Sequence, residues 1–225
     1  MAKAAVIVGI GPGLGTAVAR RFAREGFSLA VIARGRRTVE AAAGVPVLSL
    51  TADATDEPAL HAALDTAVDR FGVPDVVVYN AAIIQADAPG ELSAHGHLDA
   101  WAVNVVGAVS TAARLLPAMA ERGSGTFLIT GGMPEPKPDY LSLSLGKAGV
   151  RALASALDTR YRPDGVHVGS VTVHGPIAPG TAFDPDDIAE HYWRLHTEEP
   201  GSWRLEAHHT GQWSPSSSLS SPGSR

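Results

Sequence analysis

The chain has 225 residues, a formal net charge of -5 and no cysteine. Its length suits one sizeable α/β domain and leaves little room for two full domains. The mildly acidic balance gives no reason to expect a nucleic-acid partner, and a chain without cysteine forms no disulfide and no cysteine-ligated metal site. We see no room for a signal peptide before the first apolar segment, and no apolar run near the roughly 18 residues of a membrane span. We therefore expect a cytoplasmic protein without a membrane partner.

The first predicted unit is a strand over residues 4–9, a glycine-rich turn and a helix over residues 14–25. Glycines allow the backbone to turn sharply and to approach a pyrophosphate closely, and the helix that follows directs its unpaired N–H groups at the anion. A strand, glycine turn and helix in this order are typical of a mononucleotide-binding unit. We expect cofactor contacts from Gly9, Gly11, Pro12, Gly13, Leu14 and Gly15.

Strands and helices then alternate along the chain, which is the pattern of a parallel sheet covered on both faces. The sequence predicts a single-domain, doubly wound α/β sheet of the Rossmann type over residues 1–213, with ligands bound beyond the carboxyl ends of the strands. The Ser-, Pro- and Gly-rich end, residues 214–225, is predicted to be a disordered tail. The further predicted strands cover residues 28–33, 47–51, 75–80, 126–130 and 167–173, and the further helices cover residues 57–71, 97–122, 142–161 and 186–196.

From residue 4 to residue 181 the chain resembles the short-chain dehydrogenase/reductase family, on motifs that occur in the family's order. Gly9, Gly13 and Gly15 match its glycine motif. Other matches are the segments 51–56 and 79–82, the Asn-x-x-Gly that begins at Asn104, the lysine end of Tyr-x-x-x-Lys at Lys147, and residues 174–181 in the place of Pro-Gly-x-Ile/Val-x-Thr.

The resemblance implies an oxidoreductase that binds a nicotinamide dinucleotide and acts on a small-molecule substrate. It assigns the adenine contact to Asp53 and the catalytic asparagine and lysine to Asn104 and Lys147. It also implies a substrate lid over residues 178–205, and a homodimer or homotetramer built through the two long helices. The implied cofactor contacts beyond the glycine turn are Asp53, Ala54, Asn80, Ala81, Lys147, Pro176, Ile177 and Thr181.

The end of the second predicted strand indicates which dinucleotide binds. An acidic residue there would bind the ribose 2′-hydroxyl and repel a 2′-phosphate, but the sequence has Arg34, Arg36 and Arg37 and no acid. A guanidinium makes forked, charge-assisted hydrogen bonds to phosphate. We therefore predict NADP(H), with Arg34 as the chief contact. The alternative is that these arginines only form a solvated loop.

The usual catalytic side chains are substituted. In the family a tyrosine transfers the proton, a lysine four residues later lowers the pKa of that tyrosine, and a serine polarises the substrate carbonyl. Here Leu143 stands four residues before Lys147 and cannot transfer a proton. Gly131 and Gly132 fall at the serine position, although counting back thirteen residues from Leu143 would place Thr130 there.

Other groups are candidates for proton transfer. Tyr140 is seven residues before Lys147, on the same helical face but about 10 Å away along the axis. The alternative is that Tyr140 only packs at the helix entry that Pro138 indicates. Asn104 and Lys147 can hold a water or the ribose. His174, beside the expected nicotinamide site, is a further candidate because the ordinary pKa of histidine lies near neutrality.

Two functions remain open. One is an NADP(H)-dependent oxidoreductase of the short-chain type that acts on a carbonyl or alcohol with a substituted active site. The other is an NADP(H)-binding protein that does not catalyse and serves as a sensor or partner subunit. The sequence predicts no metal site, because the histidines at 95 and 97 and at 208 and 209 lack a third ligand at suitable spacing.

Overall fold

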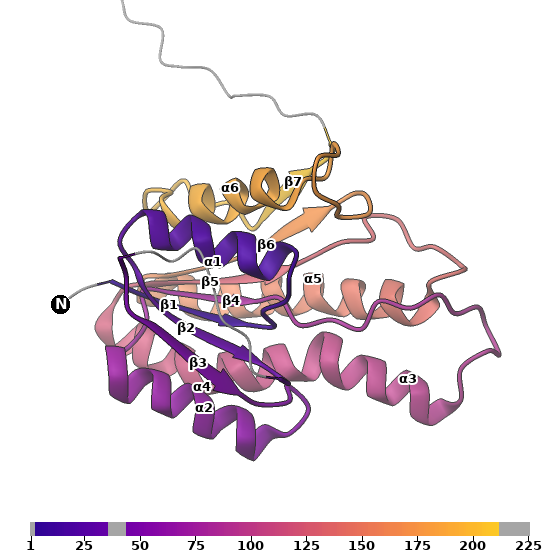
Figure 1. The fold of residues 1–225 in the computed structure, drawn as a ribbon, viewed down its shortest axis with the longest axis horizontal. Helices are drawn as coiled ribbons and strands as arrows, with labels where there is room; N and C mark the ends of the chain where they lie inside the picture. The colour runs from indigo at the N-terminus through magenta and orange to yellow at the C-terminus, as the bar shows by residue number, and fades with distance from the viewer. Residues whose placement is uncertain (1–2, 36–43, 212–225) are drawn as a thin grey trace, which may run out of the picture.

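The computed structural model describes residues 3–35 and 44–211. Within these residues, seven parallel strands form one sheet in the order β3-β2-β1-β4-β5-β6-β7, with helices on both faces (Figure 1). This confirms the predicted Rossmann-type sheet. The strands are β1 (Ala4–Val8), β2 (Ser28–Ala33), β3 (Val47–Thr51), β4 (Val76–Tyr79), β5 (Gly125–Thr130), β6 (Val166–Val173) and β7 (Glu206–His209), and the α-helices are α1 (Leu14–Arg24), α2 (Glu57–Phe71), α3 (Ala94–Trp101), α4 (Gly107–Arg122), α5 (Leu141–Tyr161) and α6 (Pro185–His196).

The two faces of the sheet bury alternate residues of each strand. In β1, Ala5 and Ile7 pack into the cluster that includes residues of α1 and α6, whereas Val6 and Val8 pack into the cluster with residues of α2, α4 and α5. Figure 1 shows α1 and α6 together on one side of the sheet and α2 and α4 on the other. Burial on both faces explains why the central strands are continuous apolar runs in the sequence.

The six predicted strands agree with the observed ones to within one residue at each end. The sequence did not predict the position of β7, because Glu206–His209 has no apolar run. Only Ala207 and His209 of this strand are buried. Pairing with β6, rather than local sequence, makes it a strand. The predicted tail at 214–225 lies outside the described residues.

The predicted helix over 97–122 is wrong in detail. The helical stretch begins three residues earlier and consists of α3, a π-helical turn over Ala102–Val106, and α4. A π-turn inside a helix frequently marks a functional position. By length and composition the stretch Ala94–Arg122 could cross a membrane, contrary to our expectation from the sequence. More than half of its most apolar window is buried inside the fold, as in a core helix.

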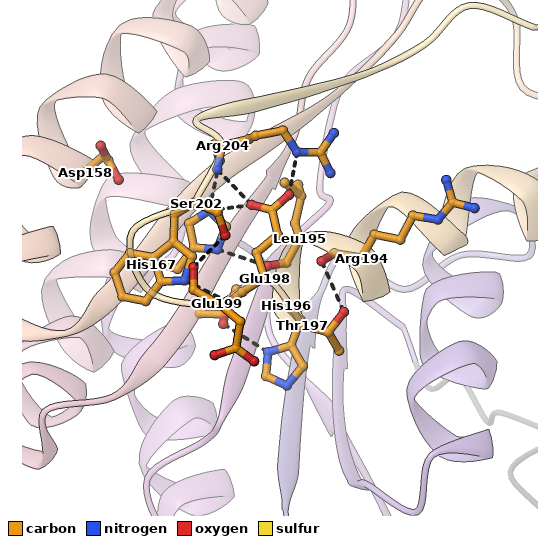
Figure 2. Close-up of polar contacts among 12 residues, drawn as sticks. Asp158, His167, Arg194, Leu195, His196, Thr197, Glu198, Glu199, Ser202 and Arg204 are labelled. Atoms are coloured by element: carbon orange, nitrogen blue, oxygen red, sulfur yellow. Dashed lines mark hydrogen bonds and ion pairs between the residues drawn. The ribbon is translucent and has the colours of Figure 1, made fainter. Parts of the chain in front are cut away.

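A buried histidine ties α6 and β7 to β6. The Nδ1 atom of His167 lies 3.0 Å from the main-chain oxygen of Leu195, and its Nε2 atom lies 2.8 Å from that of Arg204 (Figure 2). The Trp203 ring stacks on the imidazole with centroids 5.2 Å apart, and Glu198 Oε2 is 4.0 Å from Nε2. These contacts fix the loop that leads into β7, and so help to set where that strand lies beside β6.

Candidate functional site

A cavity of about 1060 Å³ opens at the carboxyl ends of β1, β4, β5 and β6. It includes the point between β1 and β4 where the strand order reverses, which is where ligands bind in doubly wound sheets. Lys147 and Tyr140 line it, but Asn104 does not. Of the predicted cofactor contacts, Pro12 and Thr181 are not among the lining residues. The contacts that do line it are Gly9, Gly11, Gly13, Leu14, Gly15, Arg34, Asp53, Ala54, Asn80, Ala81, Lys147, Pro176 and Ile177.

The glycine turn is packed tightly on one side and open on the other. Gly9 has a φ of +91°, and a Cβ at this position would lie 2.2 Å from the main-chain nitrogen of Ala81. A Cβ at Gly15 would lie 2.8 Å from the Gly9 oxygen, which also accepts a hydrogen bond from Asn80 Nδ2 at 2.8 Å. A Cβ at Gly11 would meet nothing within 4 Å. The turn therefore presents bare backbone to the cavity.

The N-terminus of α1 has no side-chain cap. Asp56 caps α2 and Asp184 caps α6, each by accepting a main-chain N–H. At α1 the first residues, Leu14 and Gly15, line the cavity instead. Unpaired N–H groups and the positive end of the helix dipole favour an anion at such a position. This arrangement fits a dinucleotide pyrophosphate.

One acidic and one basic side chain lie where β2 and β3 end. The main-chain N–H and the hydroxyl of Thr55 both donate to Asp53, and these hydrogen bonds, with the nearby charge of Arg34, hold the pKa of the carboxyl below its usual value. Arg34 is exposed at the same end of the cavity. Arg36 and Arg37, the other two arginines that follow the second predicted strand, lie outside the described residues.

A polar network crosses the floor of the cavity. The Lys147 ammonium donates to the main-chain oxygen of Thr130 at 2.6 Å. The Thr130 hydroxyl lies 2.8 Å from Asn80 Oδ1, to which it donates, and 2.7 Å from the Tyr192 hydroxyl. Burial lowers the pKa of Lys147 to about 8, and burial raises the pKa of Tyr192. The Lys147 ammonium therefore loses its proton close to neutral pH.

The loop after β5 needs its glycines. A Cβ at Gly131 would lie 2.4 Å from the Thr172 hydroxyl oxygen, and Gly132 has a φ of +154°. Met133 also has a positive φ, of +46°. The Arg151 guanidinium holds the loop by donating to the main-chain oxygens of Gly132 and Met133 at 3.0 and 3.1 Å. A serine at Gly131 would therefore displace its neighbours.

The start of α5 brings an apolar side chain to the cavity. Leu143 is buried and lines the cavity one helical turn before Lys147. Tyr140 lies at the N-cap position of α5, as the sequence predicted, and forms an isolated β-bridge with Asp87. The Asp87 carboxylate accepts hydrogen bonds from the main-chain nitrogen and hydroxyl of Ser142, at 2.9 and 2.8 Å. The Ser142 hydroxyl is thereby engaged in fixing the helix entry.

Asn104 lies in the π-turn, one layer behind the cavity. Its Oδ1 accepts from the main-chain nitrogen of Ile83 at 2.8 Å, and its Nδ2 is 3.4 Å from the oxygen of Ile83. A Cβ at Gly146 would lie 2.8 Å from the Asn104 Cβ. Because Ile83 lines the cavity, this amide positions the segment after β4 against α5.

Sequence reasoning missed Tyr192 and Arg151 as parts of the site. Tyr192 is 62 residues from Thr130 and reaches it from α6, and Arg151 reaches the β5 loop from α5. Nothing in the local sequence of either residue differs from that of an ordinary helix, so only the packing of distant elements reveals them.

The chain is similar to known dehydrogenases and reductases in sequence and in fold. A family model described as short chain dehydrogenase matches residues 3–182. A putative ketoacyl reductase of Streptomyces coelicolor is 30% identical over 213 residues, covering 88% of this chain and 79% of that protein. Glucose 1-dehydrogenase 2 of Bacillus subtilis is 30% identical over 197 residues, covering 83% and 74%.

A solved structure of an alcohol dehydrogenase from the archaeon Thermococcus sibiricus, complexed with 5-hydroxy-NADP, superposes with a TM-score of 0.83 at 26% identity, over 95% of this chain and 99% of that one. An actinorhodin polyketide ketoreductase variant with NADPH shares the fold, with a TM-score of 0.84 at 24% identity, over 93% of this chain and 96% of that one. The family match spans most of the sequence and the whole cavity edge of the sheet up to β6. This chain belongs to the short-chain dehydrogenase family.

Proposed function

We propose that this protein is an NADP(H)-dependent oxidoreductase that interconverts a carbonyl and an alcohol in a site with substituted catalytic residues. The observation that carries this proposal is the cavity itself. It joins an uncapped helix N-terminus, bare glycine backbone and Arg34 at one end to the buried ammonium of Lys147 at the other. Dehydrogenases and reductases among its relatives, and solved neighbours with NADP-type ligands, support the same function.

NADP(H) fits the charges of the cavity. The α1 terminus would hold the pyrophosphate, Arg34 the 2′-phosphate, and Asp53 with Ala54 the adenosine. When bound, the dinucleotide supplies or accepts a hydride. Lys147 lies deep enough to hold the nicotinamide ribose, and Pro176 and Ile177, after β6, line the same end of the cavity.

The proposed site lacks the family's tyrosine and serine, because Leu143 and the glycines after β5 stand at those positions. Tyr140 lines the cavity from the helix entry, and Lys147 is a buried cation with a pKa of about 8. Either group, or a water held near Lys147, can exchange a proton with a substrate oxygen. Asn104 acts behind them by positioning the segment that contains Ile83.

The test is a fluorescence titration of the wild type and Arg34→Ala with NADPH and with NADH. We expect micromolar binding of NADPH, at least tenfold tighter than of NADH. Arg34→Ala should weaken NADPH binding about tenfold, about 1.4 kcal/mol, and leave NADH unchanged. Arg160→Ala is the matched control, since Arg160 is an exposed arginine on α5 that pairs with Asp164. If neither nucleotide binds to the wild type, the proposed function is wrong.

The alternative, an NADP(H)-binding protein without catalysis, rests on the apolar Leu143 at the usual proton-donor position. A screen of carbonyl compounds separates the two functions. The oxidoreductase is supported if the wild type turns over a carbonyl and this turnover is lost when Lys147 is substituted and in Tyr140→Phe. Tight NADPH binding with no turnover of any carbonyl supports the alternative.

A homo-oligomer is the proposed assembly, through the faces of α3, α4 and α5. Exposed large apolar side chains gather on these helices, at Leu98, Trp101, Val109 and Leu145. Burying these side chains against a second copy would remove them from water. Light scattering of the wild type and of Leu145→Asp checks this proposal, and a monomeric wild type would contradict it.

A further inference from the structure

A pair of histidines, His174 and His208, lies at the rim of the cavity. His174 follows β6 directly and lines the cavity together with Gly175, Pro176 and Ile177. Its main-chain N–H donates to the oxygen of His209 at 3.0 Å, which fixes it beside β7. Both His174 and His208 are exposed to solvent. The pair therefore borders the cavity on one side and water on the other.

The imidazoles are linked to a carboxylate in one chain of contacts. His174 Nε2 lies 2.9 Å from His208 Nδ1, with the two ring planes at 72°. His208 Nε2 lies 3.5 Å from Glu206 Oε2. The other oxygen of Glu206 accepts a hydrogen bond from the buried Thr172 hydroxyl. Thr172 thus anchors the carboxylate at the inner end of the chain.

The strand register produces this arrangement. Thr172 pairs with His208 across β6 and β7, and residues two apart on a strand lie on the same face. Glu206 is therefore the diagonal neighbour of Thr172, and His174 is the diagonal neighbour of His208. Loss of the β6–β7 register would separate His174 from His208 and Thr172 from Glu206.

The contacts can be made in two forms that differ by one proton. A carboxylate only accepts, so His208 Nε2 carries a hydrogen that faces Glu206. When His208 is neutral, its Nδ1 accepts from Nε2–H of His174, and His174 Nδ1 is a free base. When His208 is an imidazolium, its Nδ1–H donates to His174 Nε2, and His174 carries its proton on Nδ1. Glu206 offsets the charge of the second form.

We propose that His174 is a catalytic residue that exchanges the proton with the substrate oxygen, and that His208 and Glu206 are positioning residues that hold and recharge it. This inference rests on the proposed function. In carbonyl reduction, bound NADPH would supply the hydride for the new C–H bond, and the Nδ1 proton of His174 forms the new O–H bond. The proton on His208 Nδ1 moves to His174 Nε2, and the pair regains one proton from water. Alcohol oxidation is the reverse.

The surroundings of His174 favour its neutral form near neutral pH. Partial burial and His208 lower the pKa of His174, with a smaller contribution in the same direction from His209 on β7, whereas Glu206 and Glu135 oppose this shift. Lys137, Tyr140 and Lys147 line the same cavity from the β5–α5 segment and from α5 itself. The proton-donating form therefore gains population as the pH falls below 6.5, and reduction should become faster in that range.

The test compares His174→Ala, His208→Gln and the control His95→Gln with the wild type. His95 is an exposed histidine on α3 that lies near Asp99. For each variant, NADPH affinity, thermal melting and the pH profile of 2,3-butanedione reduction are measured between pH 5 and 9. We expect His174→Ala to lose about 100-fold in kcat, to keep its NADPH affinity and to be partly rescued by added imidazole. His208→Gln should lose about tenfold and flatten the profile, and His95→Gln should change nothing.

A second readout needs neither cofactor nor substrate. Histidine NMR of the free protein should show that His208→Gln shifts the titration of His174, as a shared proton requires. This inference is wrong if His174→Ala leaves kcat and the pH profile unchanged, or if His208→Gln does not shift the titration of His174. Either result would leave the proposed function intact. A wild type that binds NADPH but reduces no carbonyl would overturn the catalytic role together with the oxidoreductase. Absence of NADPH binding would overturn the proposed function itself.

Discussion

The ammonium of Lys147 on α5 donates a 2.6 Å hydrogen bond to the main-chain oxygen of Thr130 at the end of β5. This bond joins the helix to the strand at the floor of the cavity. Thr130 in turn contacts Asn80 after β4 and Tyr192 on α6. Thr130 thus connects α5, α6 and the segment after β4, and Leu143, not a tyrosine, stands on the turn before Lys147.

Lys147 should make stability rise with pH in the alkaline range. Its pKa is about 8 in the fold and about 10.4 in an unfolded chain. Between these values the unfolded state binds more protons, so the free energy of unfolding increases with pH. Relative to Lys147→Met, the wild type should gain about 2 kcal/mol from pH 7 to pH 9.5. Urea unfolding of both proteins at the two pH values measures this, and a constant difference would contradict it.

Two glycines of the same turn should respond differently to alanine. Gly9→Ala places a Cβ against Ala81 at a positive φ, and should cost roughly 2–4 kcal/mol of unfolding free energy. Gly11→Ala places its Cβ in open space and should change stability by less than about 0.5 kcal/mol. It should nevertheless weaken NADPH binding, because the methyl group enters the cavity. Denaturant unfolding and NADPH titration of both variants test this, and equal destabilisation would show that the turn is packed otherwise.

Leu143→Tyr should raise the rate of carbonyl reduction. The side chain lines the cavity one turn before Lys147, and a phenol there gains a cation that favours its ionised form. An added general acid contributes typically 100-fold or more. Leu143→Phe is the control, since it adds the ring without the hydroxyl. Steady-state rates of carbonyl reduction by the two variants test this prediction, and equal rates would contradict it.

His196 should make the fold less stable in acid. Its imidazole packs against the rings of Phe22 and Phe27 and lies 2.9 Å from the Thr126 hydroxyl. Burial, together with the charge of Lys3, lowers the pKa of His196 to about 4. Between pH 6.5 and 4 the unfolded chain binds the extra proton, so stability falls as pH falls, by on the order of 2–3 kcal/mol. His196→Gln should reduce this dependence of stability on pH, whereas His95→Gln, at an exposed site, should not. The free energy of unfolding of both variants at pH 7 and 4.5 tests this.

Local sequence was sufficient for the fold and for locating the glycine-rich end of the cavity. The central strands could be predicted because continuous apolar runs between helical segments bury both faces of a parallel sheet. The glycines that line the cavity could be located because glycine spacing and strand ends are short-range features. The π-turn over Ala102–Val106 was not predicted, and its Asn104 contacts Ile83 and Gly146, which lie in other parts of the chain.

The sequence by itself determined that the chain forms a doubly wound sheet with a glycine turn at its first strand, and that Leu143 lies four residues before Lys147. These properties depend on residue type and on spacing within one or two elements. Only the tertiary structure decided which polar groups meet. Thr130 reaches Tyr192 across 62 residues because α6 packs on the sheet, and His174 reaches His208 across 34 because β6 and β7 are neighbouring parallel strands. The register of β6 against β7, which no local pattern encodes, placed His208 beside His174 at the rim of the cavity.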